Sequence, residues 1–260
     1  MSRLKIGVPL GAAVLLGLLV SRAAINTTED TELRDLDLAG WDCANQSEGT
    51  AQSQDARERN RLKNRWPVNL SLFPVEPLDT AGFLKKVREY DSRLQSQRRG
   101  ELTAAQKDEL DSYENQVVSL TGFLVLAYAG PPETTNCASP VFHDWHLEIF
   151  ESPTDHAPQV GDPTLIICEV TPRTEQRIYL DGARIQSLAG FFRLQDASYK
   201  AIGHKAHKVR LTGYLMWDDE HNGSADVGSN IQYFSNNGFH HPWRSTAWEI
   251  HPVIRVEVIH

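Results

Sequence analysis

Two segments in the C-terminal half of the chain pair an acidic residue with a histidine two positions away. In VFHDWHLEIFE, Asp144, His146 and Glu148 alternate with apolar residues, and in STAWEIHPVIRVEV the pair is Glu249 and His251. Residues two apart on an extended strand project from the same face, separated by roughly 6–7 Å along the backbone. Each segment therefore predicts a strand that carries a carboxylate and an imidazole side by side.

Carboxylates and imidazoles at this spacing are suited to bind one divalent ion. A metal site takes three or four such ligands. The two strands offer Asp144, His146, Glu249 and His251 for Zn, Mn or Mg, and the segment WDDEHN could add another ligand. A bound metal would serve the hydrolysis of a phosphodiester or a similar ester. Without a metal, an imidazole oriented by a carboxylate can act as a general base, which makes His146, His251 and Glu249 the candidate catalytic residues.

The opposing interpretation is that these strands are ordinary. A solvent-facing sheet surface shows the same alternation without any function. All ten histidines lie between His143 and His260, which favours a common purpose. The chain contains no His-Glu-x-x-His, Cys-x-x-Cys or Gly-x-Ser-x-Gly motif, and no glycine-rich phosphate loop. The metal hypothesis therefore depends on whether the two strands meet in the fold.

Aromatic residues support a second hypothesis, a non-catalytic binding module. Trp217 and Trp243 could offer stacking surfaces to a base or a sugar, and the polar segment SNNGFHHPWRS could cover such a site. The ligand would be an oligosaccharide, a peptide or a nucleic-acid strand. The net charge of −8 disfavours generic nucleic-acid binding, because affinity for phosphates depends on Lys and Arg. We prefer the binding module with an Asp/His/Glu pocket and keep the metal-dependent hydrolase as the alternative.

Strand-like periodicity begins at Val117. The predicted strands span residues 117–128, 141–151, 164–171, 208–218 and 247–258, with a helix around 181–189 between the third and the fourth. Five strands with a helical insertion after the third follow the OB-fold plan, a coiled barrel in which the first strand pairs with the second and the fourth. A small sandwich is the competing fold. Gly122 and Gly213 interrupt two similar stretches, LTGFL and LTGYL, and predict sharp bends.

The chain before Val117 divides into three parts. Residues 1–24 hold two basic residues followed by fifteen uncharged ones, which is typical of a signal peptide or a short membrane anchor. Residues 25–65 are polar and predict a disordered tether. Residues 66–116 predict an extended lead-in and two short amphipathic helices, before the barrel domain at 117–260. The first follows Asp79 and Thr80 as possible caps, and the second begins at Thr103-x-x-Gln106, which has the form of a capping box. The leader predicts an exported protein, periplasmic or extracellular, which contacts the membrane or cell envelope through residues 1–24.

Three cysteines in an oxidising compartment leave at least one unpaired. Cys137 and Cys168 both fall in the barrel domain and could form a bridge, whereas Cys43 lies in a polar stretch. Three free thiols are the alternative.

The segments DWHLEI and WEIHPVIRVEV, with VRLTGYLMWDDEHN between them, resemble a loose group of exported, mostly bacterial proteins of uncharacterised function. Members share an Asp-x-His-Leu strand and a terminal Glu-Ile/Leu-His-Pro-Val strand. The resemblance covers residues 117–258 and implies an OB-like barrel in which Asp144, His146, Glu249 and His251 hold the matching positions. It implies no established reaction.

Overall fold

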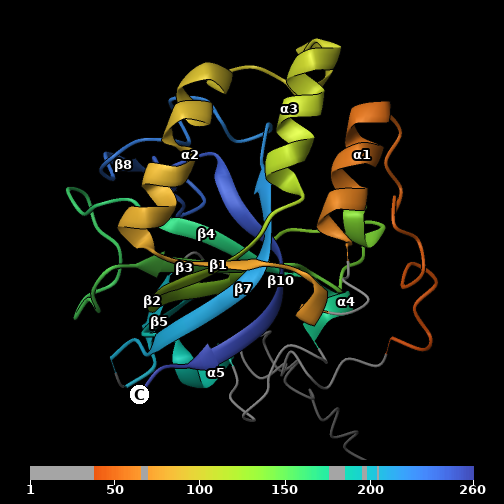
Figure 1. Ribbon diagram of the computed structural model, residues 1–260. Helices are drawn as coiled ribbons and strands as arrows, with labels where there is room; N and C mark the ends of the chain where they lie inside the picture. The colour runs from red at the N-terminus through yellow and green to blue at the C-terminus, as the bar shows by residue number, and fades with distance from the viewer. Residues whose placement is uncertain (1–37, 66–69, 176–184, 195–197, 204) are drawn as a thin grey trace, which may run out of the picture.

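The computed structural model describes residues 38–65, 70–175, 185–194, 198–203 and 205–260 (Figure 1). The predicted leader at residues 1–24 lies outside the described residues, as does the first part of the predicted tether. No helix within the described ranges is long and apolar enough to cross a membrane.

The centre of the protein is a closed, mixed β-barrel (Figure 1). Its strands are β2 (Val117–Ala129), β3 (Trp145–Phe150), β4 (Ile166–Val170), β7 (Lys208–Trp217) and β10 (Trp248–Val258). All five predicted strands are thereby confirmed, with ends that differ by a few residues. β2 pairs antiparallel with β3 and β7, as predicted for the first strand. β4 pairs antiparallel with β3 and parallel with β10, and β10 pairs antiparallel with β7. β4 therefore lies between the two strands that carry the acid–histidine pairs.

Short strands and helical turns flank this barrel. β1 (Val75–Asp79) runs parallel to β2, β5 (Phe191–Arg193) and β6 (Tyr199–Ala201) continue the sheet from β2, and β8 (Tyr233–Phe234) forms a hairpin with β9 (His240–His241). Two helical turns, α4 (Pro172–Glu175) and α5 (Ile185–Leu188), follow β4. α5 confirms the second half of the predicted helix at 181–189, and residues 181–184 lie outside the described residues.

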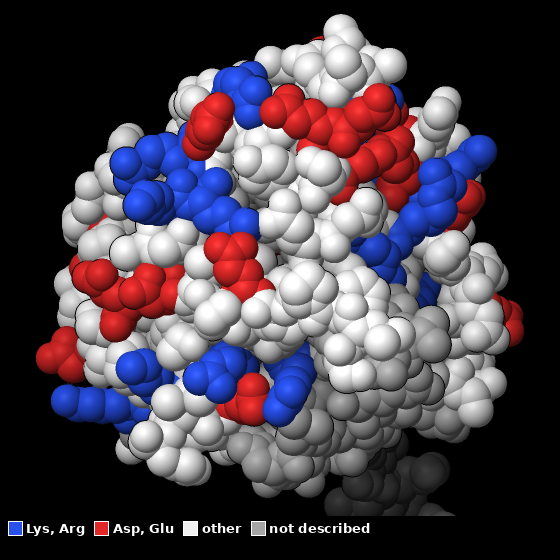
Figure 2. Space-filling model, in the orientation of Figure 1, with Lys and Arg blue, Asp and Glu red and all other residues white. Residues whose placement is uncertain are grey.

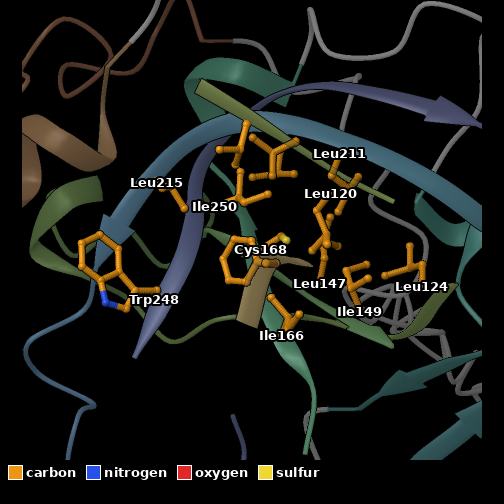
Figure 3. Packing of buried hydrophobic residues seen from close by; sticks show 14 of the residues in the cluster. Leu120, Leu124, Leu147, Ile149, Ile166, Cys168, Leu211, Leu215, Trp248 and Ile250 are labelled. Atoms are coloured by element: carbon orange, nitrogen blue, oxygen red, sulfur yellow. The ribbon is translucent and has the colours of Figure 1, made fainter. Parts of the chain in front are cut away.

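The barrel is filled by alternate residues of all five strands (Figure 3). Figure 3 shows Leu120, Leu147, Cys168, Leu215 and Ile250 converging from β2, β3, β4, β7 and β10. These side chains are fully buried. Because side chains alternate along a strand, their neighbours on β3, β4 and β10 point outward.

Gly122 and Gly213 occupy places where another chain segment comes too close for a side chain. A Cβ atom on Gly213 would overlap the carbonyl oxygen of Pro252 and lie 2.5 Å from Cγ2 of Ile250. A Cβ atom on Gly122 would lie 2.5 Å from Cγ2 of Ile149. The glycines therefore permit close strand packing where β2 and β7 cross their neighbours.

Helices α2 (Thr80–Leu94) and α3 (Ala104–Glu114) stand together over one end of the barrel (Figure 1). Asp79 caps α2 by accepting a hydrogen bond from the amide of Gly82, and Thr103 forms the predicted capping box with Gln106. The apolar face of α2 is buried, and Tyr90 packs edge-on against Trp248 of β10 at a centroid distance of 5.9 Å. The predicted amphipathic helices are confirmed.

The prediction of a disordered tether is wrong for residues 38–65. This segment contains α1 (Gln54–Lys63), capped by Ser53, and it lies against the barrel. Cys43 is joined to Cys137 by a disulfide, and Cys168 is free and buried in the core. The predicted Cys137–Cys168 bridge is therefore also wrong. Hydrophobic content alone did not reveal that polar contacts and a covalent link would order this segment.

Replacing Gly213 with alanine tests the close approach of β7 and β10. Overpacking of this kind costs about 1–3 kcal/mol, so we expect Gly213→Ala to lower the free energy of unfolding by that amount in denaturant titrations. Gly223→Ala is the matched control, because a Cβ atom there meets nothing within 4 Å. Equal unfolding midpoints for the two variants would contradict the proposed role of Gly213.

Candidate functional site

The outward faces of β3, β4 and β10 carry a row of titratable side chains. His146 on β3 is the cross-strand partner of Glu169 on β4, and the pairing of Cys168 with Ile250 places Glu169 beside Glu249 and His251 on β10. This face is not open to solvent, since Glu169 is 2% exposed and His251 is 0% exposed. The interpretation of these residues as an ordinary solvent-facing surface is therefore wrong.

Glu169 connects the two predicted pairs. His146 Nε2 lies 2.7 Å from Glu169 Oε1, and His251 Nδ1 lies 3.1 Å from Glu169 Oε2. Nδ1 of His251 also forms a hydrogen bond with Glu249 Oε1 at 3.0 Å, and Nε2 of His251 lies 3.6 Å from Asp144 Oδ2. The structure thus brings together all four residues predicted as metal ligands and adds Glu169, which the sequence analysis did not select.

A second branch leads from Glu249 to the segment WDDEHN. Arg244 donates to Glu249 Oε2 at 2.6 Å and to Asp218 Oδ2 at 2.7 Å. Asp218 Oδ2 is also 2.8 Å from Nδ1 of His221. Burial lowers the pKa of Arg244, but the adjacent carboxylates of Asp218 and Glu249 outweigh this effect and raise it. WDDEHN therefore reaches the cluster through a buried guanidinium and supplies no direct ligand.

The cluster is covered by the N-terminal segment and by the connection between β2 and β3. Asn136, in the turn Thr134–Asn136 of that connection, donates to Asp144 Oδ1 at 2.8 Å and accepts from Arg173 Nη1 at 2.9 Å. Lys63, the last residue of α1, lies 2.7 Å from Glu133 Oε2. The Cys43–Cys137 disulfide joins these two covering segments. Burial of the site thus depends on residues that composition predicts to be a tether.

Burial and crowding shift the protonation of the cluster. Burial lowers the pKa of His251, but Glu169 and Glu249 outweigh it and raise that pKa to about 10. Burial, together with the charge of Glu133, raises the pKa of Asp144 to about 6. Burial also raises the pKa of Glu169, but His146 and His251 reverse this effect and hold it well below its ordinary value. The raised pKa of His251 favours its protonated form, so His251 is one of the cations that compensate Glu169 and Glu249.

Several ligating atoms at this site have no hydrogen-bond partner within the described part of the chain. They include Asp144 Oδ2, Glu169 Oε2 and His251 Nε2, all of them buried. Asp144, Glu169 and His251 each offer one ligand atom within 4.8 Å of the others, and so do Glu133, His146 and Glu169. Buried polar atoms ordinarily have partners. Two groups that share Glu169 therefore have the composition and the spacing to hold a metal ion.

A pocket of about 340 Å³ opens beside this cluster. Its lining comes from β2, β3 and the connections β2–β3 and β7–β10, and comprises Tyr128, Pro131, Glu133, His146, His221, Asp226, Ser235, Asn237, Phe239, His241 and Trp243. Trp243 lines this pocket, whereas Trp217 is 0% exposed in the core, beneath the guanidinium of Arg99. The prediction that Trp217 stacks on a ligand is wrong, because the Trp217 side chain is buried in the core.

Glu148 belongs to a separate pair. It is fully buried on β3, and its Oε2 lies 3.4 Å from Nε2 of His240 on β9. The hydroxyl of Tyr199 on β6 is 3.1 Å from Nδ1 of the same imidazole. This pair connects the β8–β9 hairpin to the barrel and so fixes one side of the pocket.

Comparisons with protein families, with curated proteins and with solved structures find no match to this chain.

Replacing Glu249 with glutamine tests the charge balance of the cluster. The variant leaves Arg244 and His251 without their shared carboxylate, and removing one partner from a buried ion pair costs about 3–5 kcal/mol. We expect Glu249→Gln to lower the free energy of unfolding by that amount in urea titrations at neutral pH. Glu257→Gln on the same strand, whose partner Arg255 is about 40% exposed, should change it by less than about 1 kcal/mol. Equal losses in the two variants would contradict the proposed balance.

Proposed function

We propose that this chain is an exported OB-like binding module whose ligand pocket lies directly beside a buried divalent-metal site. The pairing of the first barrel strand with the second and the fourth supports the OB-like plan. OB-folds bind ligands on the face of their second and third strands, between the first and last connecting loops. The pocket occupies the corresponding place, with His146 on β3 in its wall. The apolar leader at residues 1–24 supports export.

One observation carries the metal site: Asp144, Glu169 and His251 each offer a buried ligand atom within 4.8 Å of the others, and Asp144 Oδ2 and His251 Nε2, 3.6 Å apart, have no hydrogen-bond partner among the described residues. Two carboxylates and one imidazole suit Zn, Mn or Mg. Metal-bound histidines usually donate their second ring nitrogen to a carboxylate, and Glu249 stands at Nδ1 of His251 for that purpose. Arg244 fixes the orientation of Glu249. Asp144, Glu169 and His251 would hold the ion, and Glu249 and Arg244 would support them.

A metal-dependent hydrolase is the second candidate, and the group Glu133, His146 and Glu169 favours it. Two members of this group line the pocket, and catalytic metal sites keep a position open to substrate. A divalent metal would supply Lewis-acid chemistry there on a phosphodiester or similar ester. Of the predicted catalytic residues, only His146 reaches the pocket. His251 and Glu249 are fully buried and can act only by positioning other groups.

Metal titration tests the buried site. Purified full-length protein, stripped with chelator, should bind Zn, Mn or Mg in calorimetry. Bound metal at a hundredfold excess over Kd contributes about 2.7 kcal/mol, so Tm should rise by several degrees. Asp144→Asn and His251→Gln should each weaken binding at least tenfold. The exposed pair Asp155→Asn and His156→Ala serves as the matched control. Unchanged Tm with all three metals, or equal affinity in the Asp144→Asn variant, would disprove this site.

Hydrolysis of bis(p-nitrophenyl) phosphate tests the second candidate. If the chain is a hydrolase, metal-loaded protein should release nitrophenol, and His146→Ala should lower kcat by about a hundredfold or more, because His146 alone of the predicted catalytic residues faces the pocket. His156→Ala should retain the wild-type rate. Absence of turnover in wild-type protein with each metal would leave only the binding module.

A further inference from the structure

We infer that the pocket between the β2–β3 connection and the β8–β9 hairpin binds a neutral saccharide. This inference deepens the proposed binding function by naming the class of ligand, and it takes from that proposal only the location of the site. It needs no bound metal.

Three titratable side chains of the pocket wall are paired within the protein. Glu133 is paired with Lys63, His146 with Glu169, and His221 with Asp218. Among the residues that line the pocket there is no Lys or Arg. On the face around α2 and α3 drawn in Figure 2, Lys and Arg likewise form separate groups with acidic residues between them. A polyanion such as a nucleic-acid strand would therefore find no surplus of cations.

The aromatic rings of the wall are held in fixed orientations. The indole Nε1 of Trp243 donates to Asp226 Oδ1 at 3.1 Å, and the guanidinium of Arg244 lies 4.2 Å from the Trp243 ring centroid. The guanidinium of Arg193 lies 3.6 Å from the ring centroid of Phe239. Planar rings fixed in this way offer rigid apolar surfaces at little entropic cost.

Aromatic surface continues from the pocket onto the hairpin. Tyr233 stacks on His241, a lining residue, with ring centroids 5.1 Å apart and an interplanar angle of 15°. Tyr233 is 49% exposed and Phe234 is 37% exposed. Adjacent strand residues project to opposite faces, so Tyr233, on the side of His241, is the hairpin ring that continues the pocket wall. The hairpin therefore extends the binding surface beyond a single ligand ring.

Polar groups stand between these rings. Asp226, Asn237 and His241 add a carboxylate, an amide and an imidazole to the same wall. A sugar ring has apolar C–H faces and hydroxyl groups around its edge, so it packs on aromatic planes while its hydroxyls bond to such side chains. A peptide added to the barrel as a strand would instead need an unpaired edge, and the barrel strand in this wall that carries His146, β3, is paired on both sides. Neutral saccharide is the ligand class that matches the wall.

Calorimetry with cellohexaose, chitohexaose, laminarihexaose and maltohexaose tests this inference on the full-length protein. We expect one of these saccharides to bind, with unchanged affinity after chelator treatment. Phe239→Ala should weaken it by about tenfold or more, as expected for loss of a stacking surface, and Asp226→Asn should also weaken it. Phe73→Ala is the matched control, since Phe73 is a similarly half-buried ring that packs near Tyr214, away from the pocket.

Three results would overturn the inference: no binding of any of the four saccharides, equal affinity in Phe239→Ala and wild type, or binding of a twelve-residue oligothymidylate in their place. Metal binding measured on the same samples separates the two proposals. Saccharide binding without metal binding removes the buried metal site alone, whereas metal binding without saccharide binding removes this inference alone.

Discussion

The arrangement of β3, β4 and β10 depends on one electrostatic constraint: the buried carboxylate of Glu169 must be neutralised by a histidine on each neighbouring strand. A carboxylate on the outside of the barrel but beneath a covering segment is desolvated, and an unpaired buried charge is expensive. His146 and His251 compensate it from the strands on either side. Because β4 lies between β3 and β10, these contacts fix the register in which the polar faces of the three strands meet. The same carboxylate belongs to both groups able to hold a metal.

The covering segment explains how so many charges remain away from water. Residues 38–65 have little apolar content, yet their polar groups are matched to partners on the barrel: Lys63 to Glu133, Arg59 to Asp219, and Asn60 to Thr134. The Cys43–Cys137 disulfide spans 94 residues of sequence. A bridge that closes so long a loop removes much of the freedom of the unfolded chain. The disulfide and the polar contacts together stabilise the folded position of residues 38–65, which bury little apolar surface of their own.

Features that depend on a local sequence pattern could be predicted from the sequence alone. Strand-like sequence patterns, either alternating or continuously apolar, located all five barrel strands, and the capping residues Asp79 and Thr103 located α2 and α3. The sequence also indicated both acid–histidine pairs, because a two-residue spacing can be recognised within one strand, without knowing which strand lies beside it. Glu169 was missed because LIICEV reads as a continuous apolar strand. One feature of the sequence could have identified Glu169: it is the single charged residue within that apolar run. An acidic residue is rarely buried without a partner, so its position predicts a paired, buried carboxylate.

Long-range features required the structure. The burial of Trp217 depends on helix α3 and Arg99 lying over β7, and the pairing of Cys43 depends on where residues 38–65 fold back. Strict alternation along β10 would place Ile254 with Trp248 and Ile250. A register shift between Ile250 and Val253 instead turns Val253 into the core and Ile254 outward, toward Val117 and Tyr214. Bulges of this kind carry no reliable local pattern.

The buried cluster and the pocket are structurally linked, because adjacent residues contribute to each. Trp243 lies in the pocket wall while Arg244 reaches into the cluster. On β3 and its lead-in, His146 faces the pocket and Asp144 lies in the sealed part of the cluster. The two regions therefore share backbone on both sides, and a ligand bound in the pocket, as proposed, would contact rings that stand next to residues of the cluster. If the proposed ligand binds there, the ion pairs of the cluster hold the pocket wall in position before the ligand arrives, which would lower the entropic cost of binding.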